Sequence, residues 1–414
     1  MKVSILTLGC KVNQSESMII EGNLIKHGCS IVGISEYPDY CIINTCTVTK
    51  KSDYQSRQLI RKAIRTGSKV IVTGCYAQLK PEDIQDIKGV TRIVYNNNKY
   101  SIINILTGIQ SSYTYTYTYT SKSRPYIKVQ DGCNFSCTYC VVPLARGKSK
   151  STNISEVINQ AIEFESLGYK EIVLTGIHLG SYGKDLKNNT NLSKLIKELL
   201  NKTRIPRIRL SSLEIKEIND EIIELIQDKR ICRHLHLPLQ SGDDRILNYM
   251  NRMYNTKEYE KTVNNIYKKL SDIAIGADVI VGFPGESKKE FLNTKNLINS
   301  LPFSYLHLFP FSSRPNTIAS KMKEQNSPYV KRERLSELNA INIKKKMTYM
   351  SAQKGKTVDI IIEERLDNDV SVGTSSNYLK VEIPSKTYDK GSLVYVRIRD
   401  VEENKVKGEP IDKL

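Results

Sequence analysis

The 414-residue sequence has no long hydrophobic run, since no stretch approaches the roughly 18 uninterrupted apolar residues that a membrane helix requires. Its opening residues, Met1–Thr7, lead into a strand-like segment and lack the longer apolar core of a signal peptide. Neither a membrane-spanning nor a secreted protein is expected, and we predict a cytoplasmic one. Cysteines stay reduced in the cytoplasm, so the nine cysteines are better explained by metal binding or catalysis than by disulfides.

Acidic residues are outnumbered: 44 Asp and Glu stand against 62 Lys and Arg, which gives a formal net charge of +18. A surplus of this size favours a polyanionic partner, which for a protein without membrane segments usually means nucleic acid. The alternative is a lysine-rich proteome with no special partner. The content of 39% hydrophobic and 26% charged residues is that of a folded protein, and the length predicts roughly two to four domains.

Residues 1–110 alternate short apolar runs with amphipathic stretches, which is typical of a small parallel α/β domain. The expected strands are Val3–Leu8, Cys41–Ile43 and Val70–Thr73, and the expected helices are Ser15–Lys26 and Ser52–Arg65. Each expected strand leads to a cysteine, at Cys10, Cys46 and Cys75. Because ligands of open parallel sheets bind beyond the carboxyl ends of the strands, these three thiols could meet at one edge.

Three further regions follow along the chain. Residues 111–124 hold an alternating run, Tyr113–Thr120, which lacks an apolar face and is interpreted as a linker or an edge extension. Strand and helix patterns alternate again through residues 125–350, which predicts a full or partial parallel barrel with its active site at the carboxyl-end loops. Residues 351–414 show short strands punctuated by glycine and asparagine, which predict a small antiparallel β-barrel. The expected strands of the parallel barrel are Tyr126–Gln130, Glu171–Thr175, Arg207–Ser211, His234–Leu237, Ala277–Val281 and Tyr305–Phe309.

A cysteine triplet, Cys133, Cys137 and Cys140, follows the first expected strand of the parallel barrel. A tight loop with this spacing can direct three thiolates at one cube-shaped iron–sulfur cluster and leave its fourth iron without a protein ligand. Such an open iron is what a reactive cofactor needs for chelation. Structural zinc is the alternative, but it requires four ligands, and no fourth cysteine or histidine lies nearby in sequence; the next candidate is His178.

The spacing Cys133-x-x-x-Cys137-x-x-Cys140 after a first barrel strand resembles the signature of the radical S-adenosylmethionine (SAM) superfamily. This resemblance implies a [4Fe–4S] cluster that chelates SAM and reduces it to methionine and a 5′-deoxyadenosyl radical, which abstracts hydrogen. The three cysteines would then be both metal ligands and catalytic residues. The resemblance further implies SAM contacts from positions on or after the barrel strands, and these positions are Tyr139, Gly176, Ser212, Glu214 and Gly282.

Some of these positions have other interpretations. A plain loop accounts for Gly176, and ordinary helix capping accounts for Ser212 and Glu214. His234 and His236 share one face of a strand, where they either bind a metal or form barrel wall near the substrate.

The segments around Cys10, Cys46 and Cys75 resemble the three ligand loops of the methylthiotransferase family within the radical SAM enzymes. The segment Gly373–Tyr378 resembles the TRAM domain, a small RNA-binding barrel found in the same family. The resemblance implies that these three cysteines hold an auxiliary [4Fe–4S] cluster and that the chain inserts sulfur into an unactivated C–H bond. One SAM would supply the radical and another the methyl group. The remaining cysteines, interpreted as core residues, are Cys29, Cys41 and Cys232.

Three substrates compete within this family: threonylcarbamoyl-adenosine in tRNA, isopentenyl-adenosine in tRNA, and an aspartate of a ribosomal protein. Gly9–Ser17, Asn44–Thr49 and Ser56–Gln58 resemble the first branch most closely. The resemblance implies methylthiolation at C2 of the adenosine at tRNA position 37. The isopentenyl branch typically has Gln-Met after the first cysteine and the ribosomal branch Pro-Lys, whereas this chain has Lys11-Val12.

The charge surplus favours RNA over a protein target. A basic, helical pattern at Lys321–Lys346 and the Gly373–Tyr378 segment supply candidate contacts to the anticodon arm of a tRNA, with a solvated helix face as the alternative. These candidates are Lys331, Arg332, Arg334, Lys344, Lys345 and Lys346 for phosphates and Tyr378 for stacking on a base. An electron donor and a sulfur source are further expected partners, and a monomer is expected. A non-enzymatic, metal-containing RNA-binding protein is the interpretation from a different class.

Overall fold

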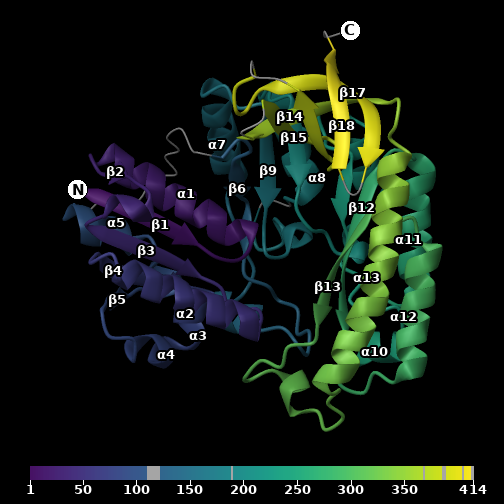
Figure 1. Ribbon diagram of the computed structural model, residues 1–414, viewed down its shortest axis with the longest axis horizontal. Helices are drawn as coiled ribbons and strands as arrows, with labels where there is room; N and C mark the ends of the chain where they lie inside the picture. Colours follow the sequence, from purple (N-terminus) through teal and green to yellow (C-terminus); the bar gives the residue numbers. More distant parts are fainter. Residues whose placement is uncertain (110–121, 188–189, 367–368, 385–387, 403–404, 412–414) are drawn as a thin grey trace.

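The computed structural model describes residues 1–109, 122–187, 190–366, 369–384, 388–402 and 405–411. The run Tyr113–Thr120, interpreted above as a linker, lies outside these residues. Figure 1 shows a layered N-terminal domain, a central set of strands flanked by long helices, and a C-terminal β-barrel. Within the described residues, no helix combines the length and the apolar character needed to cross a bilayer.

The N-terminal domain is built on an all-parallel sheet in the order β2–β1–β3–β4–β5. Its strands are β1 (Lys2–Thr7), β2 (Ser30–Ile31), β3 (Tyr40–Thr45), β4 (Lys69–Gly74) and β5 (Val90–Ile93). Its helices are α1 (Lys11–Lys26), α2 (Lys50–Ile64), α3 (Cys75–Leu79), α4 (Pro81–Gln85) and α5 (Ser101–Thr107). Buried side chains of α1 and α5 cover one face of the sheet and those of α2 and α3 the other. The predicted parallel α/β domain is confirmed; its edge strands β2 and β5 were not predicted, because they are short and carry little apolar pattern.

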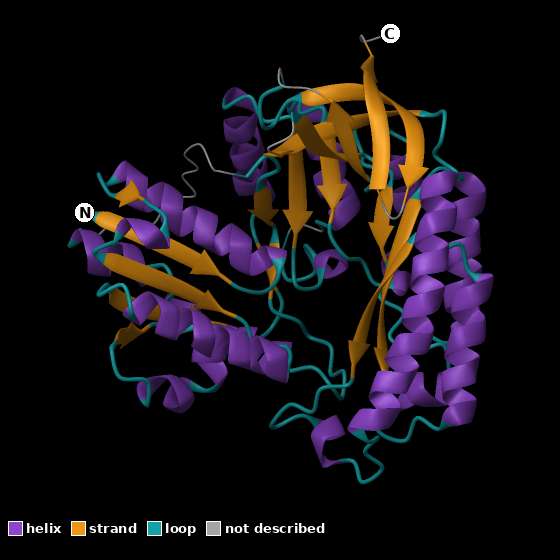
Figure 2. Cartoon of the chain, in the orientation of Figure 1, coloured by secondary structure: helices purple, strands orange, loops and turns teal. Residues whose placement is uncertain are grey.

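The central domain holds two parallel sheets, β6–β9–β10 and β11–β12–β13, joined by an isolated parallel bridge between Ile208 and Ile231. Its strands are β6 (Tyr126–Lys128), β9 (Glu171–Thr175), β10 (Arg207–Leu210), β11 (His234–His236), β12 (Ala274–Val281) and β13 (Tyr305–Pro310). Its helices are α6 (Val142–Arg146), α7 (Ile154–Ser166), α8 (Leu192–Lys202), α9 (Asp220–Ile226), α10 (Asp244–Tyr249), α11 (Thr256–Lys269) and α12 (Lys288–Ser300). Figure 2 shows the longer helices on the outer side of the strands, and one continuous buried core joins the two layers. The predicted partial parallel barrel is confirmed.

The basic helix that follows the central domain, α13, spans Pro328–Ser351, whereas the sequence predicted Lys321–Lys346. The helix begins late because Pro328 occupies its first turn, where a missing N–H costs nothing, and the side chain of Ser327 caps it by accepting from the Val330 amide at 3.3 Å. The preceding Ile318–Lys321 forms a separate 3₁₀ turn.

The C-terminal domain is a closed barrel in the order β14–β15–β16–β18–β17. Its strands are β14 (Thr357–Leu366), β15 (Val370–Ser375), β16 (Lys380–Pro384), β17 (Leu393–Glu402) and β18 (Lys405–Ile411). The small barrel is confirmed, but it is not wholly antiparallel, since β16 and β18 pair in parallel to close it. The sequence did not predict β18, because its exposed lysines alternate with only short buried side chains. Gly408 is needed there: a Cβ at this position would lie 2.2 Å from a methyl carbon of Val396.

The C-terminal barrel is fastened to the amino ends of β9 and β10 by a buried carboxylate. Glu171 pairs with Arg209 at 2.7 Å and also with Arg207 and Arg124. Arg207 donates to the carbonyl oxygen of Thr374 at 3.2 Å, and Arg209 donates to carbonyl oxygens of the same barrel. The carboxyl ends of the central strands, on the opposite side, are left free for a site.

The ion pairs of Glu171 predict that the folded protein loses stability in acid. Burial alone would raise the pKa of Glu171, but Arg207, Arg209 and Arg124 lower it to about 2, below the ordinary 4.5. A carboxyl with a lowered folded pKa contributes stability that is present above its unfolded pKa and is lost as pH falls through the folded value. We expect the thermal unfolding midpoint to fall as the pH drops from about 5 towards 2, and the Glu171→Gln variant to be less stable at neutral pH by about 3–5 kcal/mol.

The control for this experiment is Glu364→Gln, at an exposed position on β14. Thermal unfolding of the variant pair across this pH range checks the prediction. A Glu171→Gln protein with the wild-type midpoint at every pH would show that the ion pairs of Glu171 contribute nothing to stability.

Candidate active site

The loop that carries Cys133, Cys137 and Cys140 is held against its surroundings by a glycine and a glutamine. Gly132 has φ +68°, and a Cβ there would lie 2.1 Å from the carbonyl oxygen of Lys148, so only glycine allows this approach. The buried amide of Gln130 donates to the Gly132 carbonyl at 2.7 Å and accepts from the amide of His178 at 2.8 Å. The cysteine loop is thereby tied to the carboxyl end of β9.

The structure brings the three cysteines of this loop together as free thiols. Burial raises the pKa of Cys140 to about 12, with Cys137 and Cys133 as close neighbours that oppose its ionisation further. Burial also raises the pKa of Cys137, although Arg252 lowers it in part. The raised pKa values of Cys137 and Cys140 suit metal ligands, because metal binding replaces the protons of such thiols.

Two polar side chains border this trio. Arg252 Nη1 lies 3.4 Å from the sulfur of Cys137, and the same guanidinium pairs with Glu214, one of the predicted SAM contacts. His178 Nδ1 lies 3.8 Å from the sulfur of Cys133. Sequence reasoning considered His178 only as a remote zinc ligand and missed Arg252, which carries no motif and reaches the trio only through tertiary folding.

The other predicted SAM contacts surround the same region. Tyr139 packs against the cluster of buried side chains that contains Phe283 and Phe311. Gly176 lies against Gln130, where a Cβ would approach the amide oxygen to 2.9 Å. Ser212 is exposed after β10. Gly282, at φ +68°, donates its amide to the carboxylate of Glu286, and a Cβ there would lie 2.5 Å from the Lys331 side chain. These positions remain proposals, with geometry that permits a bound nucleoside.

The second trio, Cys10, Cys46 and Cys75, lies at the carboxyl ends of β1, β3 and β4. These strands are neighbours in the parallel sheet, so their ends lie at one edge. Gly9 allows a close approach, since a Cβ there would lie 2.9 Å from the Cβ of Cys46. Asn13 ties two of the loops by donating to the carbonyl oxygens of Leu8 at 2.8 Å and Thr45 at 3.0 Å.

The electrostatics of the second trio resemble those of the first. Burial raises the pKa of Cys46, and the neighbouring Cys75 and Cys10 raise it further. Burial also raises the pKa of Cys10, against the opposing effect of Arg146. The donor set again fits a cluster with one iron free of protein ligands, because only three sulfurs converge.

A buried ion network joins the N-terminal domain to the central domain beside the second trio. Glu16 of α1 pairs with Lys99 of its own domain, with Lys128 at 3.1 Å and with Arg146 at 2.9 Å. Arg146 also pairs with Asp131 at 2.7 Å. The side chains of Glu16 and Arg146 are 4% and 2% exposed, so the centre of the network is buried, whereas Asp131 at its edge is 28% exposed.

On the other side of the second trio, a second contact joins the same domains. Arg314, beyond β13, donates to the hydroxyl of Thr47 at 2.7 Å and to the carboxylate of Asp53 at 2.7 Å. Thr47 directly follows Cys46 in the chain. The loop of Cys46 is therefore held against the central domain.

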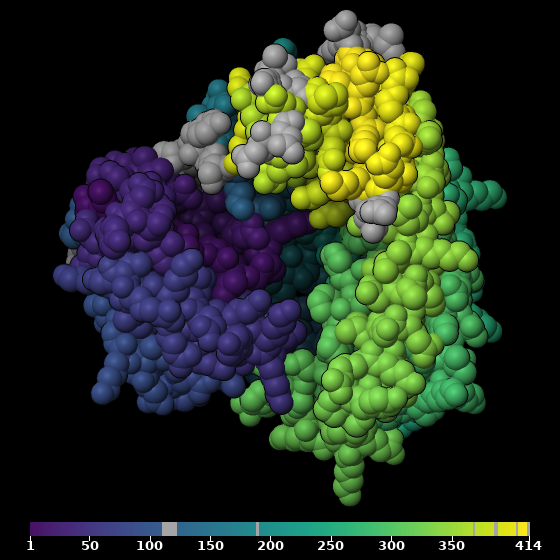
Figure 3. Space-filling view, in the orientation of Figure 1, coloured from purple at the N-terminus to yellow at the C-terminus, as the bar shows by residue number. Residues whose placement is uncertain are grey.

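A cavity of about 250 Å³ lies beside the first trio, with Cys140 in its wall. Val48 and Thr49, just after Cys46, line it together with Tyr139 and Cys140. Figure 3 shows the surface hollowed between the N-terminal domain, the C-terminal barrel and the segment that contains α13. The cavity therefore lies between one thiol of the first trio and the segment that follows Cys46 of the second trio.

The predicted RNA contacts fall into two groups. Arg332, Lys344 and Lys346 are exposed on α13. Arg334 instead is buried and pairs with the carboxylate of Glu286, so a phosphate cannot reach it as predicted.

Three further RNA candidates have partners within the chain. Lys331 lies over the ring of Phe311 at 5.2 Å. Lys345 caps the end of α12 by donating to the Leu301 carbonyl oxygen at 2.7 Å. The ring of Tyr378, predicted as a stacking surface for RNA, stacks on His234 at 4.1 Å, so one of its faces is taken by the protein.

Comparisons with known proteins agree with this geometry. Residues 127–298 match the family model of the radical SAM superfamily, and residues 2–96 match the one described as "Uncharacterized protein family UPF0004". The chain is 40% identical to the threonylcarbamoyladenosine tRNA methylthiotransferase MtaB of Aquifex aeolicus, over 88% of this chain and 93% of that protein. It is 38% identical to MtaB of Bacillus subtilis, over 96% and 93%.

More distant relatives include the tRNA-2-methylthio-N(6)-dimethylallyladenosine synthase of Fervidobacterium nodosum, at 31% identity over 99% of both chains. Among solved structures, the radical SAM methyltransferase TsrM of Kitasatospora setae matches with a TM-score of 0.59 and 12% identity, over 77% of each chain, which shows a shared fold. The 40% identity over nearly the full length of a methylthiotransferase, together with the two cysteine trios, establishes that the chain belongs to the radical SAM methylthiotransferase family.

Proposed function

We propose that this chain is a tRNA methylthiotransferase that acts at C2 of N6-threonylcarbamoyladenosine at position 37. The observation that carries the proposal is a cavity of about 250 Å³ whose wall contains Cys140 of the first trio together with Val48 and Thr49, which follow closely on Cys46 of the second trio. A cavity of that size accommodates a single nucleobase rather than a folded protein segment. Two relatives at 38–40% identity are named for threonylcarbamoyladenosine.

Each trio leaves room for an external ligand on a cluster. When bound, a [4Fe–4S] cluster at Cys133, Cys137 and Cys140 supplies the electron for cleavage of SAM, and one at the second trio supplies the iron that holds the sulfur to be transferred. The protein's own part is to hold and shield the reactants. Val141, Val142 and Ile280 give the cavity apolar walls that exclude water from a reactive radical.

The charge of the chain supports a nucleic-acid substrate. The formal net charge is +18, and the exposed cations Arg332, Lys344 and Lys346 follow one helix beside the hollow surface. Such cations bind phosphates and position an RNA, whereas the cavity reads the base. A cytoplasmic location follows from the proposed substrate.

The decisive experiment is nucleoside analysis of tRNA from a strain that lacks this gene and from the same strain carrying the wild-type gene. We expect 2-methylthio-N6-threonylcarbamoyladenosine to disappear in the deletion strain and to return on complementation, because the proposed enzyme adds the methylthio group of this nucleoside. The deletion strain that carries the Cys75→Ala variant in place of the wild-type gene serves as the control for catalysis. Unchanged nucleosides, or loss of the methylthio group from dimethylallyladenosine instead, would overturn the proposed substrate.

A further inference from the structure

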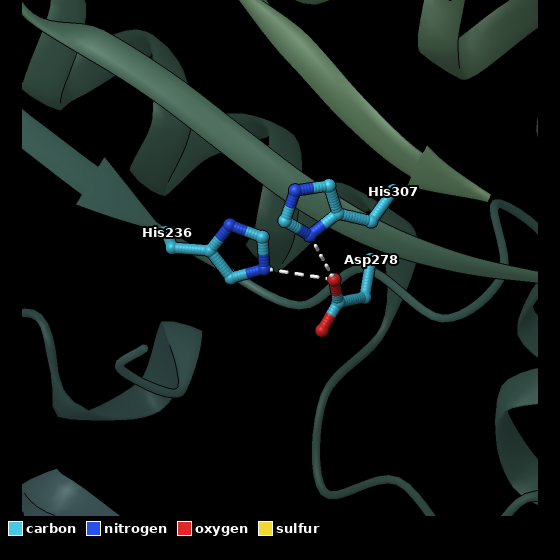
Figure 4. A group of neighbouring side chains, drawn as sticks. All are labelled: His236, Asp278 and His307. Carbon is cyan, nitrogen blue, oxygen red and sulfur yellow. Dashed lines mark hydrogen bonds and ion pairs between the residues drawn. The ribbon is translucent and has the colours of Figure 1, made fainter. Parts of the chain in front are cut away.

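The inner face of β11, β12 and β13 carries a row of polar side chains that the two cysteine trios do not use. Asp278 of β12 lies directly opposite His307 of β13 in the parallel register. His236 of β11 reaches the same carboxylate from the other side. Figure 4 shows both imidazoles pointing at one oxygen of Asp278, while its second oxygen points away from them.

The hydrogen bonds of this row form a continuous chain. Asp278 Oδ1 accepts from His236 Nε2 at 2.9 Å and from His307 Nδ1 at 3.2 Å. The other nitrogen of His236 lies 3.1 Å from the hydroxyl of Tyr305, which lies 2.8 Å from His234 Nε2. Because a carboxylate only accepts, both imidazole nitrogens that face Asp278 must carry hydrogen. The chain therefore fixes the orientation of the carboxylate.

The backbone is adapted to this row. A Cβ at Gly276 would lie 2.1 Å from the ring of Tyr305, so glycine is required for the tyrosine to lie across β12 and reach the histidines. Exposure rises along the row: His236 is 6% exposed, whereas the side chain of His307 is 51% exposed. The buried end positions the groups, and the outer end is open to a ligand.

The row meets the cavity beside Cys140 at Asp278. This carboxylate lines the 250 Å³ cavity together with Cys140 and Tyr139, and its neighbours Ile280 and Phe309 are apolar. Among the described residues, the second oxygen of Asp278 has no hydrogen-bond partner. On its other side, His307 lines a separate cavity of about 370 Å³ that also contains Lys346 and Lys380.

A metal ion is the competing occupant, since the ligand atoms of His236, Asp278 and His307 all lie within 4.8 Å of one another. A cation would have to break both hydrogen bonds to Asp278 and displace their protons. A hydrogen-bonding ligand instead uses the second oxygen of Asp278 and leaves both bonds in place.

We propose that His236, Asp278 and His307 form a polar subsite that receives the N6 substituent of the substrate adenosine. The free oxygen of Asp278 accepts a carbamoyl N–H. The outer nitrogen of His307, whose Nδ1 already donates to Asp278, accepts from the hydroxyl of the threonyl group. His236 and Tyr305 are positioning residues that hold the carboxylate. A dimethylallyl substituent offers neither a carbamoyl N–H nor a hydroxyl, so this subsite would distinguish the two tRNA nucleosides. The inference rests on the proposed function and adds the residues that select its substrate.

The test measures binding of anticodon stem-loops to the reconstituted holoenzyme without reductant, so that no turnover occurs. Two stem-loops are compared, one with N6-threonylcarbamoyladenosine at position 37 and one with unmodified adenosine, and the ratio of their Kd values is the readout. Removing a hydrogen bond to a charged group typically weakens binding by about 10- to 100-fold. We expect wild type to prefer the modified stem-loop by at least that factor, and Asp278→Asn and His307→Leu to lose the preference while binding the unmodified one equally well.

His27→Leu, at the far end of α1, is the matched control for His307→Leu and should keep the wild-type ratio. Iron content and thermal unfolding show that each variant is folded. A wild-type enzyme without any preference would overturn the proposed function itself. A wild-type preference that both variants retain would overturn only the subsite. Zinc or cobalt bound by wild type but not by His307→Leu would replace it with a metal site.

Discussion

Replacing Cys133 with alanine is expected to abolish cleavage of SAM and to lower bound iron from about eight to about four atoms per chain. The reason is that Cys133, Cys137 and Cys140 are the only sulfurs that converge in this loop, so two remaining thiols cannot hold a cube with a defined open iron. Replacing Cys75 should have the complementary effect. SAM cleavage should continue while methylthio transfer stops, because the second trio lies at the strand ends of the N-terminal domain, apart from the loop of Cys133, Cys137 and Cys140.

Anaerobic reconstitution, iron analysis and quantitation of 5′-deoxyadenosine and of methylthiolated product check both variants. The matched control is Cys232→Ala, since Cys232 is also buried but lies away from both trios before β11. It should keep the full iron content and both activities. If the Cys75 variant still formed the methylthio product, the second trio would not be the site of sulfur transfer.

The Glu16→Gln variant is expected to show the second large effect, a loss of about 3–5 kcal/mol of stability, because breaking a buried ion network leaves uncompensated charges. Burial alone would raise the pKa of Glu16, but Arg146, Lys128 and Lys99 hold it well below its ordinary value. The neutral amide cannot balance these three cations. Since the network joins two domains, the N-terminal domain should also separate more readily and expose its cysteines.

Thermal unfolding and the rate of alkylation of Cys75, which is buried in the folded chain, measure these effects in the cluster-free protein. Glu224→Gln, at an exposed position on α9, is the control and should leave both unchanged. Faster alkylation without a change in unfolding would assign the network to domain docking alone. An alkylation rate equal to wild type would contradict the role of Glu16 at the interface.

The sequence predicted the cysteine trios because their signals are local. Cys133, Cys137 and Cys140 lie within one loop, and Cys10, Cys46 and Cys75 each end a strand of a parallel sheet, whose topology places strand ends at one edge. The prediction of a parallel barrel followed from strand and helix periods in the same way.

The charged groups around the trios were missed because their partners are distant in the chain. Glu16 and Arg146 are 130 residues apart, and nothing in either neighbourhood distinguishes them from surface charges. The same limit explains Arg334, which the sequence assigned to an exposed basic face but which a glutamate of another segment buries. The row at His236, Asp278 and His307 likewise depends on strand register, which periodicity alone cannot supply.

The two domain contacts at Glu16–Arg146 and Arg314–Asp53 have a consequence for how an RNA must present its target. Because these two buried contacts fasten the N-terminal domain to the rest of the chain, parting the domains to admit a stacked helix would break both of them. A tRNA nucleotide would have to rotate out of its loop and enter alone, a movement that costs a few kcal/mol and is least costly in an unpaired loop. Enzymes of this architecture would therefore choose among RNAs by how easily one purine leaves its stack, before any side chain reads it.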